Sequence, residues 1–220
     1  PNPTYEQNSL VQTDEDHTQN GSKCFITGNA DIESTSPGQG DIDGGSTILY
    51  SDLYNLSAYN DVLVTYWKWY TNNLGNNPGN DIWNVQVSSD SGLIWVDLEY
   101  TSASLNDWDE KKFVLSDFID LTSQIQFRFI ASDEFNEGDN GSGGSLVEAA
   151  LDDFKLEIIG YQQIIGDLNL DSEVDILDIV ILVNMIIGEV DPSNSADLNN
   201  DSLINVLDIV NLVNIVLGDI

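Results

Sequence analysis

The sequence contains few basic residues and a single cysteine. Among 220 residues there are 6 Lys and Arg against 38 Asp and Glu, which gives a formal net charge of −32 at pH 7. Nucleic acid and anionic membrane surfaces repel such a chain, because they carry charge of the same sign. We therefore expect no nucleic-acid partner. One cysteine excludes a disulfide within the chain, and we interpret Cys24 as a small buried apolar residue.

The sequence also lacks long apolar runs and nitrogen or sulfur metal ligands. The stretch ILDIVILVNMIIG is too short to cross a bilayer and contains Asp178 and Asn184, so we expect no membrane insertion. His17 is the only histidine, whereas a zinc enzyme needs further His or Cys ligands. No nucleophile-elbow motif accompanies His17. We expect no catalytic residues. Because the chain starts at Pro1 without a signal peptide, we expect the C-terminal region of a secreted protein.

The sequence has a large excess of acidic over basic residues. Clustered carboxylates repel one another, and calcium is the hard cation that oxygen ligands suit best. A hydrophobic content of 41% and an aromatic content of 9% are sufficient for a packed core. The composition therefore favours a folded, cation-binding protein in a calcium-rich, extracellular setting.

Two regions of the chain follow different patterns. Up to about Ile159, apolar and polar residues alternate over short stretches separated by Gly, Asn, Asp and Ser, which is typical of an antiparallel β-sandwich. From Gly166 onward, acidic loops precede apolar residues at helical spacing. We expect a β-sandwich accessory module over 1–160, a linker over 161–165 and a calcium-binding domain over 166–220.

The C-terminal region repeats one motif at an offset of 30 residues. DLNLDSEVDILD starts at Asp167, and DLNNDSLINVLD starts at Asp197. Oxygen-bearing side chains occupy positions 1, 3, 5, 9 and 12 of an EF-hand loop, and position 7 supplies a backbone carbonyl. The predicted calcium ligands are Asp167, Asn169, Asp171, Glu173, Asp175 and Asp178 in the first loop, and Asp197, Asn199, Asp201, Leu203, Asn205 and Asp208 in the second.

Two loop positions depart from the usual EF-hand pattern. Position 12 is Asp, a shorter side chain than the usual Glu. Position 6 is Ser172 in one loop and Ser202 in the other, where Gly normally allows a left-handed turn. We expect both changes to weaken calcium affinity without removing a ligand.

Residues 166–218 resemble the dockerin family. The resemblance implies two calcium loops, each followed by one helix, in a pseudo-twofold arrangement, and a cohesin module as partner on a scaffold or cell surface. The partner-binding residues that it implies are Ile176, Leu177, Val183, Asn184, Val206, Leu207, Val213 and Asn214. Many cellulosomal dockerins have Ser-Thr at loop positions 10 and 11, whereas the aliphatic pairs here indicate a more hydrophobic interface. Because the repeats are nearly identical, a partner is expected to bind in two orientations related by a half turn.

The helical stretches agree with a binding role. In DILDIVILVNMIIG, apolar residues surround almost the whole helix, more than the single stripe that two packed helices need. We expect the remaining apolar residues to meet a cohesin, the β-domain or another copy of the chain.

The end of the β-region predicts a third calcium site. Alternation in VEAALDDFKLEI places Asp152 on the same side as Phe154, where a carboxylate is costly unless it is paired. Asp41 and Asp43 flank a Gly-rich turn that is able to approach the same ion. The alternative is a carboxylate that caps backbone N–H groups.

Two further motifs lie in the β-region. In YWKWY, period-two alternation places Tyr66, Lys68 and Tyr70 on one face, a candidate sugar-stacking surface, with packing of both faces as the favoured alternative. The stretch SSDSGLIW resembles an Asp-box hairpin turn, to which we assign no catalytic role.

Most of residues 1–160 resembles jelly-roll modules behind secreted bacterial zinc carboxypeptidases, which are related to MAM and cleaved-adhesin domains. The residues that carry this resemblance are the run from DEDHTQNGSKCFITGNA through DIDGGSTILYSDLYNLSAYNDVLVTYWKWY, and the ending VEAALDDF. It implies an accessory role.

Three functions therefore stay open. The first is a non-catalytic part of a secreted hydrolase, a peptidase or a glycanase, in which a calcium-bound jelly roll precedes a dockerin that binds a cohesin. The second is a carbohydrate-binding module with a glycan or cell-surface ligand, for which the dockerin-like pair is a stabilising cap. The third is a small glycan-active enzyme that uses two carboxylates. The expected fold class is multidomain: an all-β jelly-roll sandwich followed by a small all-α dockerin-like domain, with two calcium ions in the dockerin-like part and one in the jelly roll.

Overall fold

The computed structural model describes residues 1–31, 38–75, 77–134, 144–161 and 164–218. Contacts divide the chain into two compact units, Pro1–Gly160 and Tyr161–Ile220, which we name the β-unit and the loop–helix unit. The expected linker, 161–165, includes residues 162–163, which lie outside the described residues.

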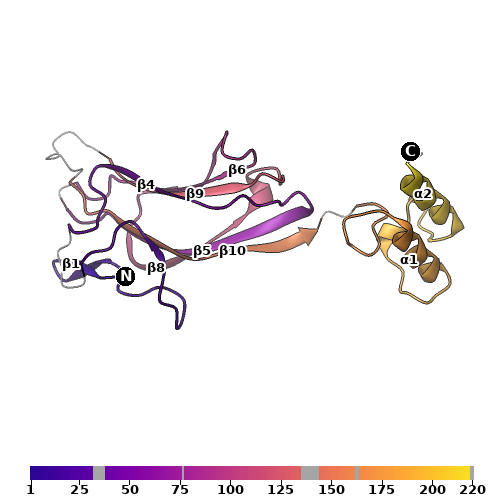
Figure 1. Ribbon diagram of the computed structural model, residues 1–220, viewed down its shortest axis with the longest axis horizontal. Coiled ribbons are helices and arrows are strands. Elements are labelled where there is room, and N and C mark those ends of the chain that lie inside the picture. The colour runs from indigo at the N-terminus through magenta and orange to yellow at the C-terminus, as the bar shows by residue number, and fades with distance from the viewer. Residues whose placement is uncertain (32–37, 76, 135–143, 162–163, 219–220) are drawn as a thin grey trace. The chain divides into compact units, whose positions relative to one another are not determined.

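The β-unit is a sandwich of two four-stranded sheets, with a separate two-stranded hairpin of β1 and β2 (Figure 1). One sheet has the strand order β3-β10-β5-β8, and the other has the order β4-β9-β6-β7. The strands are β1 (Thr4–Glu6), β2 (Ser9–Gln12), β3 (Phe25–Ile26), β4 (Gly45–Tyr50), β5 (Tyr59–Thr71), β6 (Trp83–Ser88), β7 (Val96–Thr101), β8 (Leu105–Val114), β9 (Gln126–Asp133) and β10 (Glu148–Tyr161). A short 3₁₀ helix, η1, covers Leu115–Asp117.

Alternating apolar side chains build the core between the two sheets. Val62 and Val64 of β5 point inward from one sheet, while Phe127 and Phe129 of β9 point inward from the other. In strands of period two, one face packs and the other faces outward. The predicted antiparallel β-sandwich over this region is therefore present.

The candidate sugar-stacking face is wrong, because its three residues are buried in the sandwich. Tyr66, Lys68 and Tyr70 are 0%, 3% and 1% exposed. The opposite face of this strand is covered as well: Trp69 is buried and donates a hydrogen bond from Nε1 to the carbonyl oxygen of Val11 at 2.7 Å. The alternative reading, a strand packed on both faces, describes this part of β5.

Lys68 is tolerated inside the sandwich because it meets a carboxylate. Its Nζ lies 2.6 Å from Oε1 of Glu99, whose Oε2 accepts hydrogen bonds from Tyr66 at 2.7 Å and Trp83 at 3.0 Å. Burial lowers the pKa of Lys68, while the hydrogen bond to Glu99 opposes the shift. Glu99 is thus the carboxylate partner of Lys68, and it also lies 3.7 Å from Nζ of Lys111.

The loop–helix unit contains α1 (Ile176–Ile186), α2 (Val206–Leu217) and the short 3₁₀ helix η2 (Asn194–Ala196). Its small core is built around Leu182 and Leu212, which are fully buried, together with Met185 and Ala196. Each helix starts with a capping box, with Asp175 as N-cap of α1 and Asn205 as N-cap of α2.

The expected fold class is wrong in its second half. The described chain is mostly β, a single β-sandwich domain accompanied by two short helices of 11 and 12 residues. Much of the loop–helix unit outside these helices consists of turns that side-chain hydrogen bonds hold, so the unit is not an all-α dockerin-like domain. Apolar periodicity located the helices, but the long acidic loops between them keep the helical content low.

None of the helices in the described residues is both long and apolar enough to span a membrane.

Replacing Glu99 tests the buried ion pair. Glu99→Gln leaves Lys68 without an anion in the interior, which should lower the free energy of unfolding by about 3–5 kcal/mol. The matched change Glu110→Gln breaks the exposed pair with Lys112, 2.9 Å long, and should cost about 1 kcal/mol or less. Urea denaturation followed by tryptophan fluorescence measures both variants. Equal losses would contradict the assignment of Glu99 as the essential partner of Lys68.

Candidate calcium sites

The carboxylate of Asp178 joins the first acidic loop to α1. Asp178 is fully buried on the first turn of the helix. Its Oδ1 accepts hydrogen bonds from the backbone N–H of Leu168 at 2.7 Å and Asn169 at 3.2 Å, and its Oδ2 accepts one from Asp175 at 2.9 Å. One side chain therefore fixes both the start of the loop and the start of the helix.

The start of the same loop folds around Asp167, which is 2% exposed. Its two oxygens accept N–H hydrogen bonds from Asp171 at 3.2 Å and Ser172 at 2.9 Å. Asn169 accepts from Asp171 at 3.0 Å, and Asp171 accepts from Glu173 at 2.9 Å. Successive side-chain oxygens thus turn inward along one tight turn.

The second loop repeats this network. Asp208 is fully buried and accepts from Leu198 at 2.9 Å, from Asn199 at 3.4 Å and from Asn205 at 2.8 Å. Corresponding bonds to Asp197 come from Asp201 at 3.1 Å and Ser202 at 2.8 Å. The two loops therefore have the same hydrogen-bond pattern at an offset of 30 residues.

The position 9 residues of the two loops act as helix caps. Oδ1 of Asp175 accepts from Leu177 N–H at 2.7 Å, and Oδ1 of Asn205 accepts from Leu207 N–H at 2.8 Å. This capping satisfies N–H groups that the helix leaves unpaired at its start.

Both loops contain the left-handed turn that position 6 requires. Ser172 has φ 72° and Ser202 has φ 67°, a region that serine adopts less readily than glycine. These serines therefore hold a strained backbone. The weaker calcium affinity expected from position 6 stays a prediction.

The residues of each loop fit an oxygen-ligated cation. In the described residues no three His, Cys, Asp or Glu side chains form a metal-binding group. Each loop carries carboxylates together with the side-chain amide of an Asn. Calcium accepts this mixture of oxygen donors. The sequence 161–220 contains eleven Asp and Glu and no Lys, Arg or His. No basic side chain of this unit is therefore able to balance the loop carboxylates.

The three residues expected at the β-unit calcium site do not come together. Oδ2 of Asp152 accepts the backbone N–H of His17 at 3.0 Å, as the capping alternative predicts. Asp153 has φ 50°, and both Leu151 and Phe154 contact the core, so the alternation of β10 shifts by one residue here. Asp152 consequently lies away from the apolar side. Asp43 is exposed.

Asp41 lies near a different acidic residue, Glu148. The N–H of Ile42 donates to the carbonyl of Val147 at 3.0 Å, which brings Asp41 to the start of β10. Glu148 is fully buried; its Oε2 accepts from Thr27 Oγ1 at 2.7 Å and from Gln12 Nε2 at 3.0 Å.

Three buried oxygens of this cluster accept no hydrogen bond: Oε1 of Gln12, Oδ1 of Asp41 and Oε1 of Glu148. Burial and the charge of Asp41 raise the pKa of Glu148 to about 8, and burial and the charge of Asp43 raise the pKa of Asp41 to about 6. Orphaned buried acceptors are costly, and oxygen atoms of this kind are the ligands that calcium accepts. Gln12, Asp41 and Glu148 are therefore candidate ligands of a cation.

Sequence reasoning missed Gln12 and Glu148. The signal for Glu148 is an acidic residue directly before the apolar stretch AAL of a buried strand. Gln12 lies 136 residues away from Glu148 and gives no comparable local signal.

The remaining motifs have structural roles. Asp90 accepts from the N–H groups of Leu93 at 3.0 Å and Ile94 at 2.9 Å, the hairpin turn that the Asp-box pattern predicts. The ring of His17 stacks on Trp67 at 3.7 Å between centroids, and its Nδ1 lies 2.7 Å from Asp153.

Comparison with models of protein families gave no match for this chain, and comparison with curated proteins gave none either.

The two loop sites are tested by replacing the aspartate at position 1 of each loop. The full chain with Asp167→Ala and Asp197→Ala should bind two fewer calcium ions than the parent in isothermal titration calorimetry. It should also show the reduced helical circular dichroism that chelator causes in the parent, because the remaining carboxylates repel one another. The control, Glu189→Ala with Asp191→Ala, removes the same charge outside the loops. If this control variant also bound two fewer calcium ions, the assignment of the two loops as the calcium sites would be refuted.

The Glu148 cluster predicts a pH dependence with a definite sign. Because the folded pKa is about 8 and the ordinary value is 4.5, the folded chain holds the proton more tightly between these values. Stability without calcium should therefore fall as pH rises through this window, by about 1.4 kcal/mol per pH unit at most. Saturating calcium should remove the fall. Urea denaturation at pH 5 to 8 measures it. Glu148→Gln, which cannot ionise, should lose the fall above about pH 6, while Asp41, whose pKa is raised to about 6, still contributes below it.

Proposed function

We propose that the loop–helix unit is a calcium-dependent assembly module whose partner is a cohesin-type protein module. The observation that carries this proposal is the pair of identical hydrogen-bonded loops, each joined to a helix through a buried Asp. Calcium, when bound, neutralises the loop carboxylates and fixes the turn. Asp178 and Asp208 then keep the start of each helix in place, and the side chains that follow are presented in a defined arrangement.

Apolar side chains at these helix starts are exposed. Ile176 and Leu177 are 66% and 54% exposed, and their counterparts Val206 and Leu207 are 63% and 55% exposed. Val180 and Val210 add to the two surfaces one turn later. Contiguous exposed apolar residues of this kind mark interaction sites. The pseudo-symmetry supports two equivalent binding surfaces.

The residues expected to contact the partner differ in their solvent exposure. Val183 is exposed, whereas Asn184, Val213 and Asn214 are half-buried. We therefore assign the centre of the proposed interface to the helix starts and its rim to the later residues.

We propose an accessory role for the β-unit, with a structural calcium ion at Gln12, Asp41 and Glu148. The proposed setting is a secreted or cell-surface protein with a hydrolase domain, where calcium is abundant enough to fill weak sites. The carbohydrate-binding alternative loses its main support, because Tyr66, Lys68 and Tyr70 lie inside the sandwich.

The partner surface is tested with Leu177→Asp combined with Leu207→Asp. Charges placed at the centre of an apolar interface should abolish binding of the full chain to a panel of recombinant cohesin modules, by about a hundredfold or more. Calcium stoichiometry should stay unchanged, because neither side chain is a ligand. Surface plasmon resonance with calcium and with chelator measures the binding.

Leu93→Asp is the matched control, since Leu93 is 84% exposed on the β-unit. It should leave cohesin binding intact. A panel in which no cohesin binds the parent chain in calcium, or binding that chelator leaves unchanged, would contradict the proposed function.

A further inference from the structure

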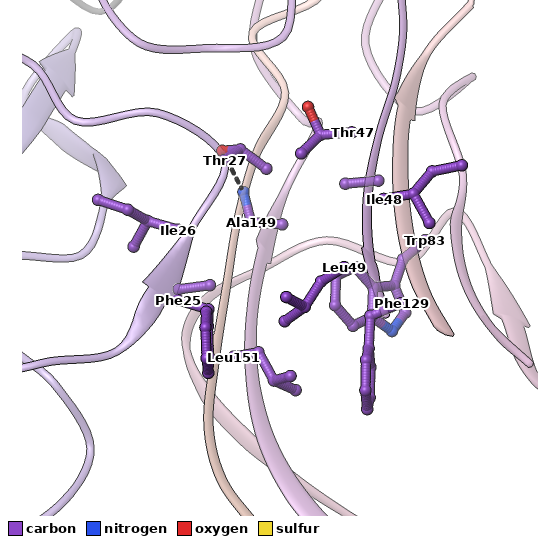
Figure 2. A pocket seen from close by; sticks show the side chains of 12 residues that line it. Phe25, Ile26, Thr27, Thr47, Ile48, Leu49, Trp83, Phe129, Ala149 and Leu151 are labelled. Atoms are coloured by element: carbon purple, nitrogen blue, oxygen red, sulfur yellow. Dashed lines mark hydrogen bonds between the residues drawn. The ribbon is translucent and has the colours of Figure 1, made fainter. Parts of the chain in front are cut away.

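An apolar cleft opens between the edges of the two sheets of the β-unit. It has a volume of about 140 Å³ and lies between β3 and β10 of one sheet and β4 and β9 of the other. Figure 2 shows Phe25 and Leu151 on one side, Phe129 and Trp83 on the other, and Leu49 between them. A second hollow of about 230 Å³ shares Phe25, Leu49, Phe129 and Leu151 with the first. The two hollows therefore form one continuous cleft.

Short strands and small residues leave this space open. β3 has only two residues, which pair with Ala150 and Leu151 of β10. Ala131 and Ala149 also line the cleft, and alanines fill little volume. An apolar cavity of about 150 Å³ is large enough to hold a benzene ring. The first hollow therefore suits one aromatic ring or one branched aliphatic side chain.

The cleft runs beside an unprotected strand edge. β4 is the edge strand of its sheet in the described residues, and its sequence GSTILY contains no charge and no proline. Ile48 and Tyr50 of this strand are 40% and 50% exposed. Natural sheets usually protect exposed edges with charges, proline or bulges, and an unprotected edge is a template for an added strand. An extended peptide is thus able to pair with β4 while one of its side chains enters the cleft.

The charge around the cleft and of the whole chain indicates which kind of peptide binds there. Asp52 lies at the second hollow, and neither hollow is lined by Lys, Arg or His in the described residues. The chain carries a net charge of −32, so two copies repel each other and a dimer through β4 is disfavoured. A segment with Lys or Arg next to its apolar anchor is attracted to the same surface.

We infer that the β4 edge and the adjoining cleft bind an extended basic peptide segment of another protein, with an aromatic or branched aliphatic side chain in the cleft and a Lys or Arg beside Asp52. This site is separate from the calcium loops and from the helix surfaces of the proposed assembly module.

The probe is the blocked peptide acetyl-TKTFKVT-amide, titrated into the full chain in saturating calcium so that the acidic loops are filled. Isothermal titration calorimetry should show one site. Backbone amide shifts in two-dimensional NMR should map to β4, Phe25 and Leu151. The control peptide acetyl-TKTSKVT-amide keeps both lysines and loses the anchor, and it should bind about tenfold or more weakly.

Two exposed positions provide variants that leave the fold intact. Phe25, 62% exposed, lines the cleft, and Asp52 is exposed beside it. Phe25→Ala and Asp52→Lys should each weaken binding of the phenylalanine peptide about tenfold. Asp117→Lys makes the same charge change outside both hollows and should have little effect.

Three results would overturn the inference. The first is equal affinity for the two peptides, which would mean unspecific attraction to a negative chain. The second is unchanged affinity in both Phe25→Ala and Asp52→Lys. The third is a set of NMR shifts confined to the loop–helix unit, or self-association of the chain through β4 in sedimentation experiments.

Discussion

The hydrogen bonds that Asp178 and Asp208 accept determine the conformation of the loop–helix unit. Each carboxylate lies on the first turn of a helix and reaches back to the second and third residues of the preceding loop. The apolar core of the unit is small, centred on Leu182 and Leu212, and no basic side chain balances its acids. Small cores stabilise weakly, so the loop conformation depends on these polar contacts.

Lys68 and Glu148, two of the buried ionisable residues of the β-unit, are stabilised in different ways. Lys68 has a carboxylate partner within the core, and the hydrogen bonds of Glu99 complete the network. Glu148 has only neutral donors, Thr27 and Gln12, and one of its oxygens accepts nothing. A chain with six basic residues is unable to pair most of its 38 acidic residues internally, and Glu148 is a buried carboxylate without a basic partner among its hydrogen bonds.

Local patterns in the sequence predicted the sandwich, the two helices and the repeated loops. These features depend on residues within a few positions of each other, so spacing alone carries the information. The prediction of an all-α second domain was wrong, because apolar periodicity marks helices but gives no measure of the loops between them. The third calcium site was predicted at Asp41, Asp43 and Asp152, whereas the structure shows Asp152 accepting a backbone N–H group and Gln12 beside Glu148, two residues that meet only after the sheets assemble. The sequence also could not decide whether the face of β5 that carries Lys68 is buried, because both faces of a strand that is covered on both sides carry apolar residues.

The shift of alternation at Asp153 determines how β10 responds to the loss of a residue. Before it, the inward residues of β10 have odd numbers, as with Leu151; after it they have even numbers, as with Phe154. Both carboxylates at the shift contact the N-terminal segment at His17 and Thr18. Loss of a single residue at this point would restore regular alternation between Leu151 and Phe154, so the apolar residues on both sides of the shift would keep facing the core. It would disturb the two carboxylates that hold the N-terminal segment, and we therefore expect release of that segment with the core of the sandwich retained.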